Sequence, residues 1–365
     1  MKITVVMPTL ACGGAERVGA AMANYWAERG DEVTFVTFDP PQASPFYELS
    51  PRLRHVKLGL FSVSNNIAAG FKNNLRRWSA LRSFFRTTKS DVIISIIGRS
   101  NVRVLLATIG FPIPVIVYEQ TDPSRDSLSP FWRTLRWIMY RRAQSIVVLT
   151  QQFAQSFSPS LQKRLSVIPN PVVMVDTVEN KHRPATEAFR LIAVGRLEQE
   201  KGFDILLRAL AKLSEPLPKW TLTILGEGSQ RQYLESLCRQ LHLENRISFP
   251  GAVKNVAEFL KQSDLFILSS KVEGFPLALC EAMTFGVPVV ATDCAASIRE
   301  IVRDEIDGVI VPPESEEALG KAIAELISKP EKCTKMALSA STIIHKLSLP
   351  TIMSKWDKLL QLALG

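Results

Sequence analysis

Short runs of apolar and β-branched residues alternate with longer segments of helical periodicity along the whole chain. Runs of this kind are typical of parallel strands that helices cover on both faces. In the first half we expect strands at residues 3–7, 32–38, 92–97, 115–118 and 145–149. In the second half we expect strands at residues 190–194, 220–225, 247–249, 265–268, 287–291 and 309–311. The pattern predicts an α/β fold with two doubly wound sheets.

A boundary between two domains is visible near the middle of the chain. Ile168-Pro169-Asn170-Pro171 closes the first half, and the polar, aperiodic stretch 176–186 follows as a linker. A chain of 365 residues is long enough for two separate hydrophobic cores. We therefore predict two Rossmann-like domains, residues 1–173 and 174–345, that face each other across a cleft.

The net charge of +9 is uneven, because residues 1–173 carry +11 and residues 174–365 carry −2. The first half is therefore expected to meet something anionic: a membrane surface, a phosphorylated substrate or nucleic acid. Nucleic acid is disfavoured, because no recognised binding motif is present. No segment reaches the roughly 20 apolar residues of a membrane span, and no signal-peptide core is evident. We expect a cytoplasmic protein.

Neither the cysteines nor the histidines form a metal-binding pattern. The five cysteines are scattered and unpaired in sequence, and we expect all of them to be small buried side chains: Cys12, Cys238, Cys280, Cys294 and Cys333. The four histidines fall outside every motif and are interpreted as surface or hydrogen-bonded residues: His55, His182, His242 and His345. No Asp-x-Asp motif occurs either, so no metal is expected.

Two strand ends carry residues suited to phosphate binding. Gly13-Gly14 lies between the first strand and a helix, where backbone N–H groups can approach an anion. A tight turn that serves only the fold explains the same pair equally well. After the strand at 190–194, Arg196 and Lys201 are cations on a loop, and they predict either phosphate binding or plain solvated charges.

A third segment, residues 273–281, follows the strand at 265–268. Pro276 suits the first turn of a helix, and Gly274 leaves the N–H groups near Phe275 and Leu277 open to an anion. Glu281 lies among apolar residues, where a charge is costly unless it is paired. Hydroxyl groups of a bound ligand, or an ion pair with an arginine, would account for it.

These segments, in this order, resemble glycosyltransferase family 4, whose members are retaining enzymes of the GT-B fold. The resemblance rests on residues 13–17 (GGAER), 168–171 (IPNP), 195–202, 226–228 and 273–281. More narrowly, the early GGAER and the basic first half are similar to bacterial members that extend saccharides on undecaprenyl diphosphate. The resemblance implies a nucleotide-sugar co-substrate, a UDP-hexose or UDP-N-acetylhexosamine, and a metal-independent front-face reaction. We also expect a C-terminal helix, residues 346–365, to pack back on the first domain.

The resemblance also implies roles on the donor side. Glu281 would bind the ribose hydroxyls, and Glu273 with the backbone at Gly274, Phe275 and Pro276 would bind those of the sugar. Arg196 and Lys201 would bind the diphosphate, helped by N–H groups at Leu277 and at Gly13-Gly14. The base would lie between Gly226-Glu227-Gly228 and Val253-Lys254.

The sequence departs from the family pattern after the strand at 115–118. Many members carry a histidine there, whereas this chain reads Glu119-Gln120-Thr121-Asp122. Gln120 can donate a hydrogen bond but cannot titrate near neutral pH. Glu119, Gln120 and Asp122 are candidates for acceptor binding, and a structural role for Glu119 or Asp122 is as well supported. Arg17, Arg76 and Arg77 are further acceptor-side candidates.

Two basic segments rich in aromatic residues, 71–86 and 131–142, complete the candidates. Each fits a helix on an anionic membrane, or a helix that faces the core and has a solvated cationic back. The charge of the first half favours the membrane, and with it an enzyme bound peripherally to the cytoplasmic face of the inner membrane. A GT-B enzyme with a soluble acceptor, and a degenerate nucleotide-sugar-binding protein, are the alternatives.

Overall fold

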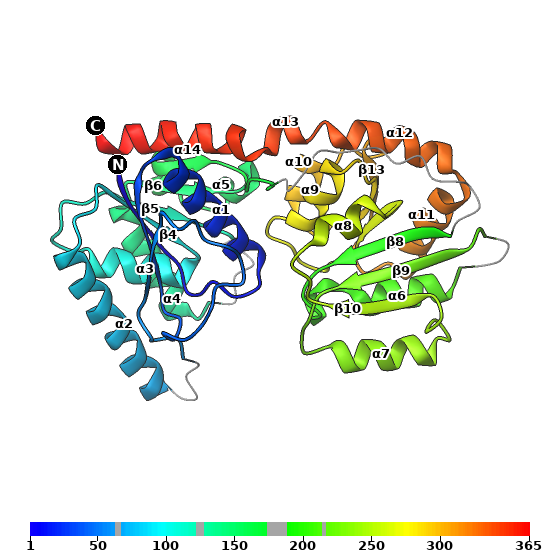
Figure 1. Ribbon diagram of the computed structural model, residues 1–365, viewed down its shortest axis with the longest axis horizontal. Helices are drawn as coiled ribbons and strands as arrows, with labels where there is room; N and C mark the ends of the chain where they lie inside the picture. Colours follow the sequence, from blue (N-terminus) through cyan, green and yellow to red (C-terminus); the bar gives the residue numbers. More distant parts are fainter. Residues whose placement is uncertain (63–66, 122–127, 174–187, 214–216) are drawn as a thin grey trace. The chain divides into compact units, whose positions relative to one another are not determined.

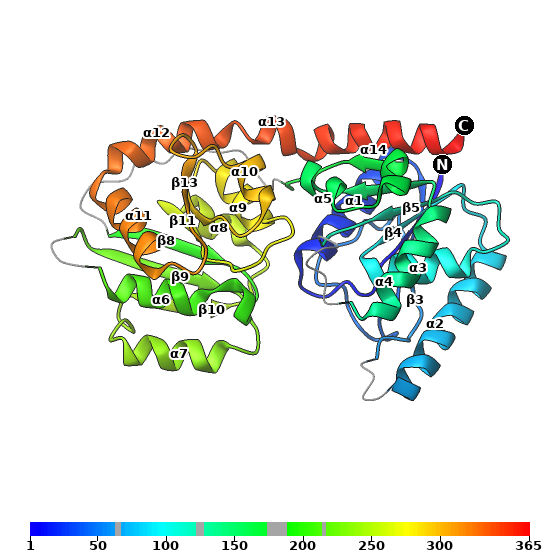
Figure 2. The ribbon, with the colours of Figure 1, turned by 180° about the vertical axis from the view of Figure 1, so that it is seen from behind.

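The computed structural model describes residues 1–62, 67–121, 128–173, 188–213 and 217–365. It divides into two compact units (Figures 1 and 2). Unit 1 comprises Met1–Pro171 and Leu349–Gly365, and unit 2 comprises Val172–Ser348. The predicted linker, His182 and Asp122 lie outside the described residues.

Unit 1 is built on a seven-stranded parallel sheet in the order β3-β2-β1-β4-β5-β6-β7. Its strands are β1 Lys2–Val6, β2 Glu32–Thr37, β3 Arg54–Lys57, β4 Val92–Ile96, β5 Val115–Tyr118, β6 Ser145–Val148 and β7 Leu165–Val167. β4, β5 and β6 are buried along their whole length, as the continuous apolar runs predicted. The edge strands β3 and β7 were not expected, because their residues are only partly buried or exposed and form no apolar run.

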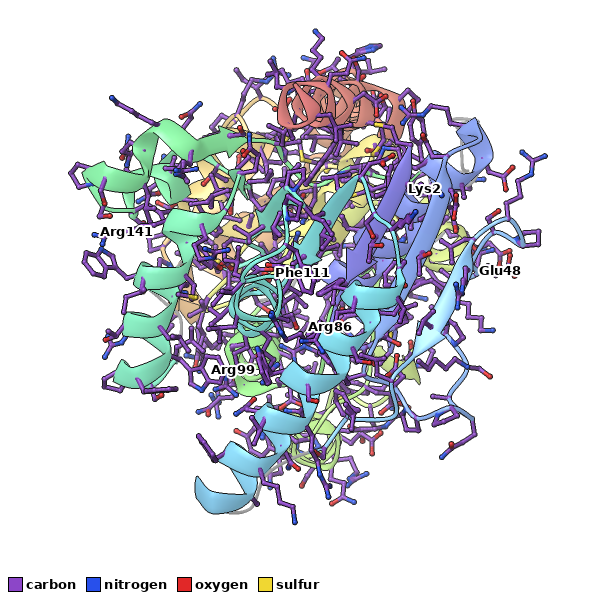
Figure 3. All side chains as sticks on the ribbon, turned by 90° about the vertical axis from the view of Figure 1, so that its left-hand side faces the viewer. Lys2, Glu48, Arg86, Arg99, Phe111 and Arg141 are labelled. Carbon is purple, nitrogen blue, oxygen red and sulfur yellow. The ribbon has the colours of Figure 1, made fainter. Side chains whose placement is uncertain are left out.

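Helices cover both faces of this sheet. They are α1 Gly14–Arg29, α2 Ile67–Thr87, α3 Gly98–Ala107, α4 Pro130–Met139, α5 Gln151–Gln155 and α14 Leu349–Leu364, with short 3-10 turns at Tyr140–Arg142 and Pro159–Arg164. α2, α3 and α4 pack side by side, and Figure 3 shows α2 and α4 on either side of α3. α14 packs against α1 instead.

The C-terminal helix α14 completes the core of unit 1. Trp356 is fully buried, and its ring meets those of Trp26 and Tyr118 edge-on at centroid distances of 6.1 and 5.0 Å. The Trp26 indole N–H donates to Asp357 at 3.2 Å, and Asp357 also pairs with Arg29. The C-terminus therefore lies beside the N-terminus (Figures 1 and 2).

Unit 2 has a six-stranded parallel sheet in the order β10-β9-β8-β11-β12-β13. Its strands are β8 Phe189–Val194, β9 Trp220–Leu225, β10 Ile247–Gly251, β11 Leu265–Leu268, β12 Val289–Thr292 and β13 Gly308–Val311. The helices are α6 Phe203–Ala211, α7 Arg231–Gln240, α8 Val256–Lys261, α9 Leu277–Thr284, α10 Ala296–Ile301, α11 Glu316–Ser328, α12 Pro330–Ser341 and α13 Ile344–Leu347, with a 3-10 turn at Gln199–Lys201. Both sheets thus have the strand order of the doubly wound α/β fold.

Candidate functional site

Ligands of doubly wound proteins bind beyond the carboxyl ends of the strands, where the strand order reverses. In unit 2 this point lies between the neighbouring strands β8 and β11. The loop after β8 contains Arg196 and Lys201, and the loop after β11 contains Glu273. The fold therefore brings together two loops that are about 70 residues apart in the sequence.

Lys201 and Glu273 are in direct contact at this point. The Lys201 ammonium lies 2.7 Å from Glu273 Oε1, and the same oxygen accepts the Ser270 hydroxyl at 2.7 Å. The Ser269 hydroxyl donates to the Lys201 carbonyl at 2.9 Å. The Glu273 side chain is only 8% exposed. The two loops are thus joined by an ion pair in which a buried carboxylate has its counter-charge.

Glycine is required where the loops approach each other most closely. Gly202 has φ +62°, and a Cβ there would lie 2.2 Å from the Ser269 carbonyl oxygen. Gly226, after β9, has φ +147°, and its Cβ would lie 1.9 Å from the Gly195 carbonyl oxygen. Both positions combine a backbone that side chains disfavour with a contact that leaves no room for one.

Next to these loops, the predicted base-binding segments line the same edge. The Leu197 N–H donates to the Glu227 carbonyl at 2.9 Å, and the Gly226 N–H to the Gly251 carbonyl at 2.9 Å. The Glu227 side chain pairs with Arg231. Val253 is half-buried and Lys254 is exposed, just beyond β10. Following the sheet order, the loops run from 251–254 through 226–228 and 195–201 to 269–273.

Arg196 differs from Lys201 in its surroundings. Its side chain is 65% exposed and pairs with Glu200 at 2.8 Å. An exposed i, i+4 pair of this kind holds the guanidinium only weakly, so a phosphate could readily compete for it.

The segment 273–281 begins α9 slightly later than its sequence suggests. Pro276 precedes the helix as its N-cap, with φ −80° and ψ 77°, and is not a member of the first turn. These angles form a tight inverse γ-turn, in which the Leu277 N–H donates to the Phe275 carbonyl at 2.9 Å. The Leu277 N–H must leave this bond before it can reach a phosphate. Gly274 and Phe275 are half-buried.

Glu281 lies in the second turn of α9 and is 5% exposed. Its charge is felt by the neighbouring thiol: burial, followed by the negative charges of Glu281 and Glu273, raises the pKa of Cys280. Burial and the charge of Glu273 likewise raise the pKa of Cys294 to about 11. These thiols therefore stay protonated at neutral pH. Their raised pKa values also show that the negative charges of Glu273 and Glu281 lie near each other at this edge of unit 2.

One expectation about the cysteines was wrong. Four of the five are buried, but Cys12 is exposed, because it precedes the helix in the loop after β1. Of the described histidines, His242 and His345 are exposed, and His55 is half-buried and hydrogen-bonded to the Thr37 hydroxyl at 3.0 Å.

In unit 1, Gly13, a donor-side candidate, is the N-cap of α1, and Gly14 begins that helix. Arg17, an acceptor-side candidate, is half-buried in its first turn. Arg76 is exposed on α2, whereas its neighbour Arg77 is buried. Glu119 is 1% exposed and accepts a hydrogen bond from the Tyr140 hydroxyl.

Gln120 is held by a residue of the IPNP motif. The Asn170 amide donates to Gln120 Oε1 at 2.9 Å, and the Gln120 amide donates to Asn170 Oδ1 at 3.2 Å. The Tyr118 hydroxyl donates to the same Asn170 oxygen at 2.5 Å. In this arrangement one N–H and the oxygen of the Gln120 amide are both engaged with Asn170.

The two basic helices behave differently from each other. The second half of α2 packs into the core through Leu81 and Phe85, while Phe71 and Leu75 in its first half are 73% and 52% exposed. α4 turns Arg136 inward and leaves Phe131, Trp137 and Ile138 exposed. The Arg141 guanidinium lies over the exposed Trp137 ring, 3.6 Å from its centroid.

No group of three or more His, Cys, Asp or Glu side chains in the described part of the chain could hold a metal ion. Within the same residues, no helix has the length and apolar character needed to cross a bilayer.

The sequence matches two family profiles in succession. Residues 12–174 match the profile described as Glycosyltransferase Family 4, and residues 175–341 match Glycosyl transferases group 1. This chain is a glycosyltransferase with a family 4 domain followed by a group 1 domain. The glycosyltransferase is 29% identical over 366 residues to a Campylobacter jejuni protein. The match covers 99% of this chain and 98% of that protein. That relative is named GalNAc-alpha-(1->4)-GalNAc-alpha-(1->3)-diNAcBac-PP-undecaprenol alpha-1,4-N-acetyl-D-galactosaminyltransferase.

Other matches extend over nearly the full length of this glycosyltransferase. The amylovoran biosynthesis glycosyltransferase AmsD of Erwinia amylovora is 25% identical, with 95% of this chain and 96% of that protein covered. The sucrose-phosphate synthase of Thermosynechococcus elongatus has a similar structure, with a TM-score of 0.84 at 18% identity and 98% of both chains covered. Anabaena HepE, solved with UDP-glucose, has a TM-score of 0.79 at 20% identity and 99% coverage of both chains. The predicted GT-B fold and glycosyltransferase activity are confirmed.

Proposed function

We propose that this glycosyltransferase moves a sugar from a UDP-hexose or UDP-N-acetylhexosamine to a saccharide carried on a lipid diphosphate, with retention at the anomeric carbon. The observation that carries the proposal is the Lys201–Glu273 pair at the carboxyl ends of β8 and β11. A cation there suits a phosphate, and a carboxylate beside it suits the hydroxyls of a sugar. The name of the Campylobacter relative supports the acceptor class, and the HepE complex with UDP-glucose supports the donor class.

The order of the loops along the sheet supports a single direction for the donor. The base would lie over Gly226-Glu227-Gly228 and Val253-Lys254, the diphosphate over Arg196 and Lys201, and the sugar beside Glu273, Gly274 and Phe275. Glu281, buried in α9, would receive the ribose hydroxyls. The backbone N–H groups at the start of α9 would attract the negatively charged diphosphate.

In the proposed reaction, the bond between the anomeric carbon and the diphosphate breaks, and the bond to the acceptor oxygen forms on the same face of the sugar. The proton of the acceptor hydroxyl passes to the departing phosphate oxygen, and UDP leaves. Arg196 and Lys201 stabilise the charge that develops on this phosphate. Because these two cations supply the charge stabilisation, the proposed reaction needs no metal.

The proposed place of action is the anionic, cytoplasmic face of the inner membrane. The apolar residues Phe131, Trp137 and Ile138 on α4, and Phe71 and Leu75 on α2, are exposed next to cationic side chains. Such a combination suits adsorption to a lipid surface, where each cation adds about 1 kcal/mol. A lipid-linked acceptor would be presented at that same surface.

The test is a binding and turnover screen on the full chain. UDP-GlcNAc, UDP-GalNAc, UDP-Gal, UDP-Glc and GDP-Man are each titrated by calorimetry, with and without a chelator, and offered with undecaprenyl-diphosphate saccharides. We expect one UDP-sugar to bind regardless of the chelator and to lose affinity about tenfold or more in Glu281→Ala and Glu281→Gln. Glu244→Ala, an exposed carboxylate elsewhere in unit 2, is the control. Absence of binding to every nucleotide sugar would overturn the proposal.

A further inference from the structure

A pocket of about 330 Å³ opens at the carboxyl edge of the sheet in unit 1. Pro8 after β1, Ile97 after β4 and Glu119 after β5 line it. The pocket therefore lies at the point where the strand order of this sheet reverses, between β1 and β4. Its volume is that of a small-ligand site.

Three arginines line this pocket: Arg77 from α2, and Arg99 and Arg103 from α3. Arg77 and Arg103 are each only 9% exposed, whereas Arg99 is exposed. Figure 3 shows Arg99 between α2 and α4, at the end of α3. Arg77 and Glu119 were candidates from the sequence, whereas Arg99 and Arg103 were not.

The two buried guanidinium groups have neutral partners. Arg103 Nε and Nη2 both donate to the Asn74 amide oxygen, at 3.0 and 2.9 Å. Arg77 donates to the carbonyls of Leu60 and Ser62 at 3.0 and 2.8 Å. Within the described residues, neither arginine lies in an ion pair. Burial, followed by the positive charges of Arg77 and Arg99, lowers the pKa of Arg103 to about 10.

A single carboxylate does not neutralise this cluster. Glu119 lines the pocket, but it also accepts the hydrogen bond of the Tyr140 hydroxyl. Among the described residues that line the pocket, three arginines thus face one carboxylate. Buried cations in excess of their counter-charges are costly, so the pocket suits an anion.

The backbone at the pocket points to the same conclusion. Ile97, the N-cap of the ten-residue helix α3, has φ +77°, which is a genuine outlier for a β-branched residue. Gly98 and Arg99, the first residues of α3, line the pocket beside it. The positive end of the α3 dipole is thereby directed at the space between the arginines.

We propose that the pocket of Arg77, Arg99 and Arg103 is an oxyanion site that receives the diphosphate of the lipid-linked acceptor. The inference rests on the proposed function for the identity of the acceptor, but the site itself is defined by the residues of unit 1. Arginine forks match phosphate oxygens in pairs, and three of them suit a diphosphate better than a single carboxylate.

The first experiment measures inorganic pyrophosphate binding to the full chain in the presence of saturating UDP, which occupies the proposed donor site. Trp132, whose ring lies 5.4 Å from the Arg103 guanidinium carbon, provides a fluorescence signal close to the pocket. We expect Arg99→Gln and Arg103→Gln each to weaken pyrophosphate binding about tenfold or more. Arg54→Gln, an exposed arginine on β3 that does not line the pocket, should bind as the wild type does.

UDP affinity is measured in parallel, so that the two proposals can fail separately. The exposed Arg99 side chain makes no hydrogen bond or ion pair within the described part of the chain. Arg99→Gln should therefore fold, and it tests the site even if Arg103→Gln unfolds. Equal pyrophosphate affinity in wild type and Arg99→Gln would overturn the inference while leaving the donor site in place. Failure of the wild-type protein to bind UDP would contradict the proposed function instead.

A second arm identifies the source of the oxyanion. The KM of a saccharide on a short isoprenoid diphosphate is compared with that of the same saccharide as a neutral octyl glycoside. We expect the diphosphate to lower KM in the wild type, and Arg99→Gln to remove most of that difference. If the variants instead weaken only the binding of a glucuronate-containing saccharide, the ligand is a sugar carboxylate and the diphosphate proposal is wrong.

Discussion

Asn170 and Gln120 hold each other's side-chain amides through two hydrogen bonds, at 2.9 and 3.2 Å. Asn170 also accepts the buried Tyr118 hydroxyl, so one side chain of the IPNP motif fixes the end of β5. Gln120 stands where many family members are expected to carry a histidine. In this chain that position is locked to the motif before the linker.

Asn170→Ala should destabilise unit 1 by about 1–3 kcal/mol, because the fully buried Tyr118 hydroxyl loses its acceptor. Gln120→Ala should cost less, since Gln120 is half-buried and Asn170 would keep its bond to Tyr118. Urea unfolding followed by tryptophan fluorescence measures both. Equal losses in the two variants would contradict the central role of Asn170.

Lys201→Ala should lower turnover by about 10²–10³-fold, the range expected when one preorganised charge is removed from a developing anion. The ammonium that pairs with Glu273 would no longer be available to the departing phosphate. Steady-state kinetics with the donor found in the screen provides the measurement. Lys212→Ala, which removes an exposed lysine at the C-cap of α6 in unit 2, is the matched control. Turnover within twofold of the wild type in Lys201→Ala would remove Lys201 from the mechanism.

Gly226→Ala should displace the loop after β9 and destabilise unit 2 by more than about 2 kcal/mol, since it adds a severe contact with the Gly195 carbonyl to a strained backbone. Gly110→Ala is a useful comparison: Gly110 also has a positive φ, +84°, but a Cβ there meets nothing within 4 Å. It should cost only about 1 kcal/mol. The difference in unfolding free energy, together with UDP affinity, tests how closely the 195 and 226 loops must pack.

The stability of unit 1 should fall as the pH drops through the range of His55. Burial, followed by the charge of Lys57, lowers the pKa of His55 below its usual value of 6.5. The unfolded chain therefore binds the proton first, and the stability contribution is full above about pH 6.5 and is lost as the pH falls toward the folded pKa. His55→Gln should flatten this dependence in denaturation curves between pH 8 and pH 5. An unchanged pH profile in the variant would assign the loss to other groups.

Phe131→Asp combined with Trp137→Asp should reduce binding to vesicles rich in anionic lipid by about tenfold or more, because two of the three large exposed apolar side chains of α4 are lost. Sedimentation with vesicles at low and high salt measures this. Leu338→Asp provides the control, since Leu338 is 63% exposed but lies on α12 in unit 2. If the wild-type protein does not bind anionic vesicles at low salt, that result would favour a soluble acceptor.

The interior strands could be predicted from the sequence because most of their residues are buried and apolar. The edge strands β3 and β7 of unit 1 could not. Arg54–Lys57 and Leu165–Val167 pair on one side only, and their composition carries no such signal. A strand of this kind is recognised only once its neighbour is in place.

The donor-side residues were predictable because glycines and charges follow strands at a shared edge. Arg103 was not, since it occurs in the middle of a helix where an arginine is ordinarily solvated. Its burial depends on α2 and α4 packing on either side of α3, which is a tertiary relationship. The inward direction of Arg136, and with it the exposure of Trp137, was hidden for the same reason.

The position of α14 has a consequence for synthesis of the protein. Trp356 fills the core of unit 1 between Trp26 and Tyr118, yet the ribosome adds it only after all of unit 2 has been made. Unit 1 emerges first but lacks the core side chains of α14, whereas unit 2, continuous in sequence, has all of its own strands and helices before α14 is translated. In the nascent chain, the side chains of Trp26 and Tyr118 therefore stay uncovered by Trp356 until α14 has been synthesised.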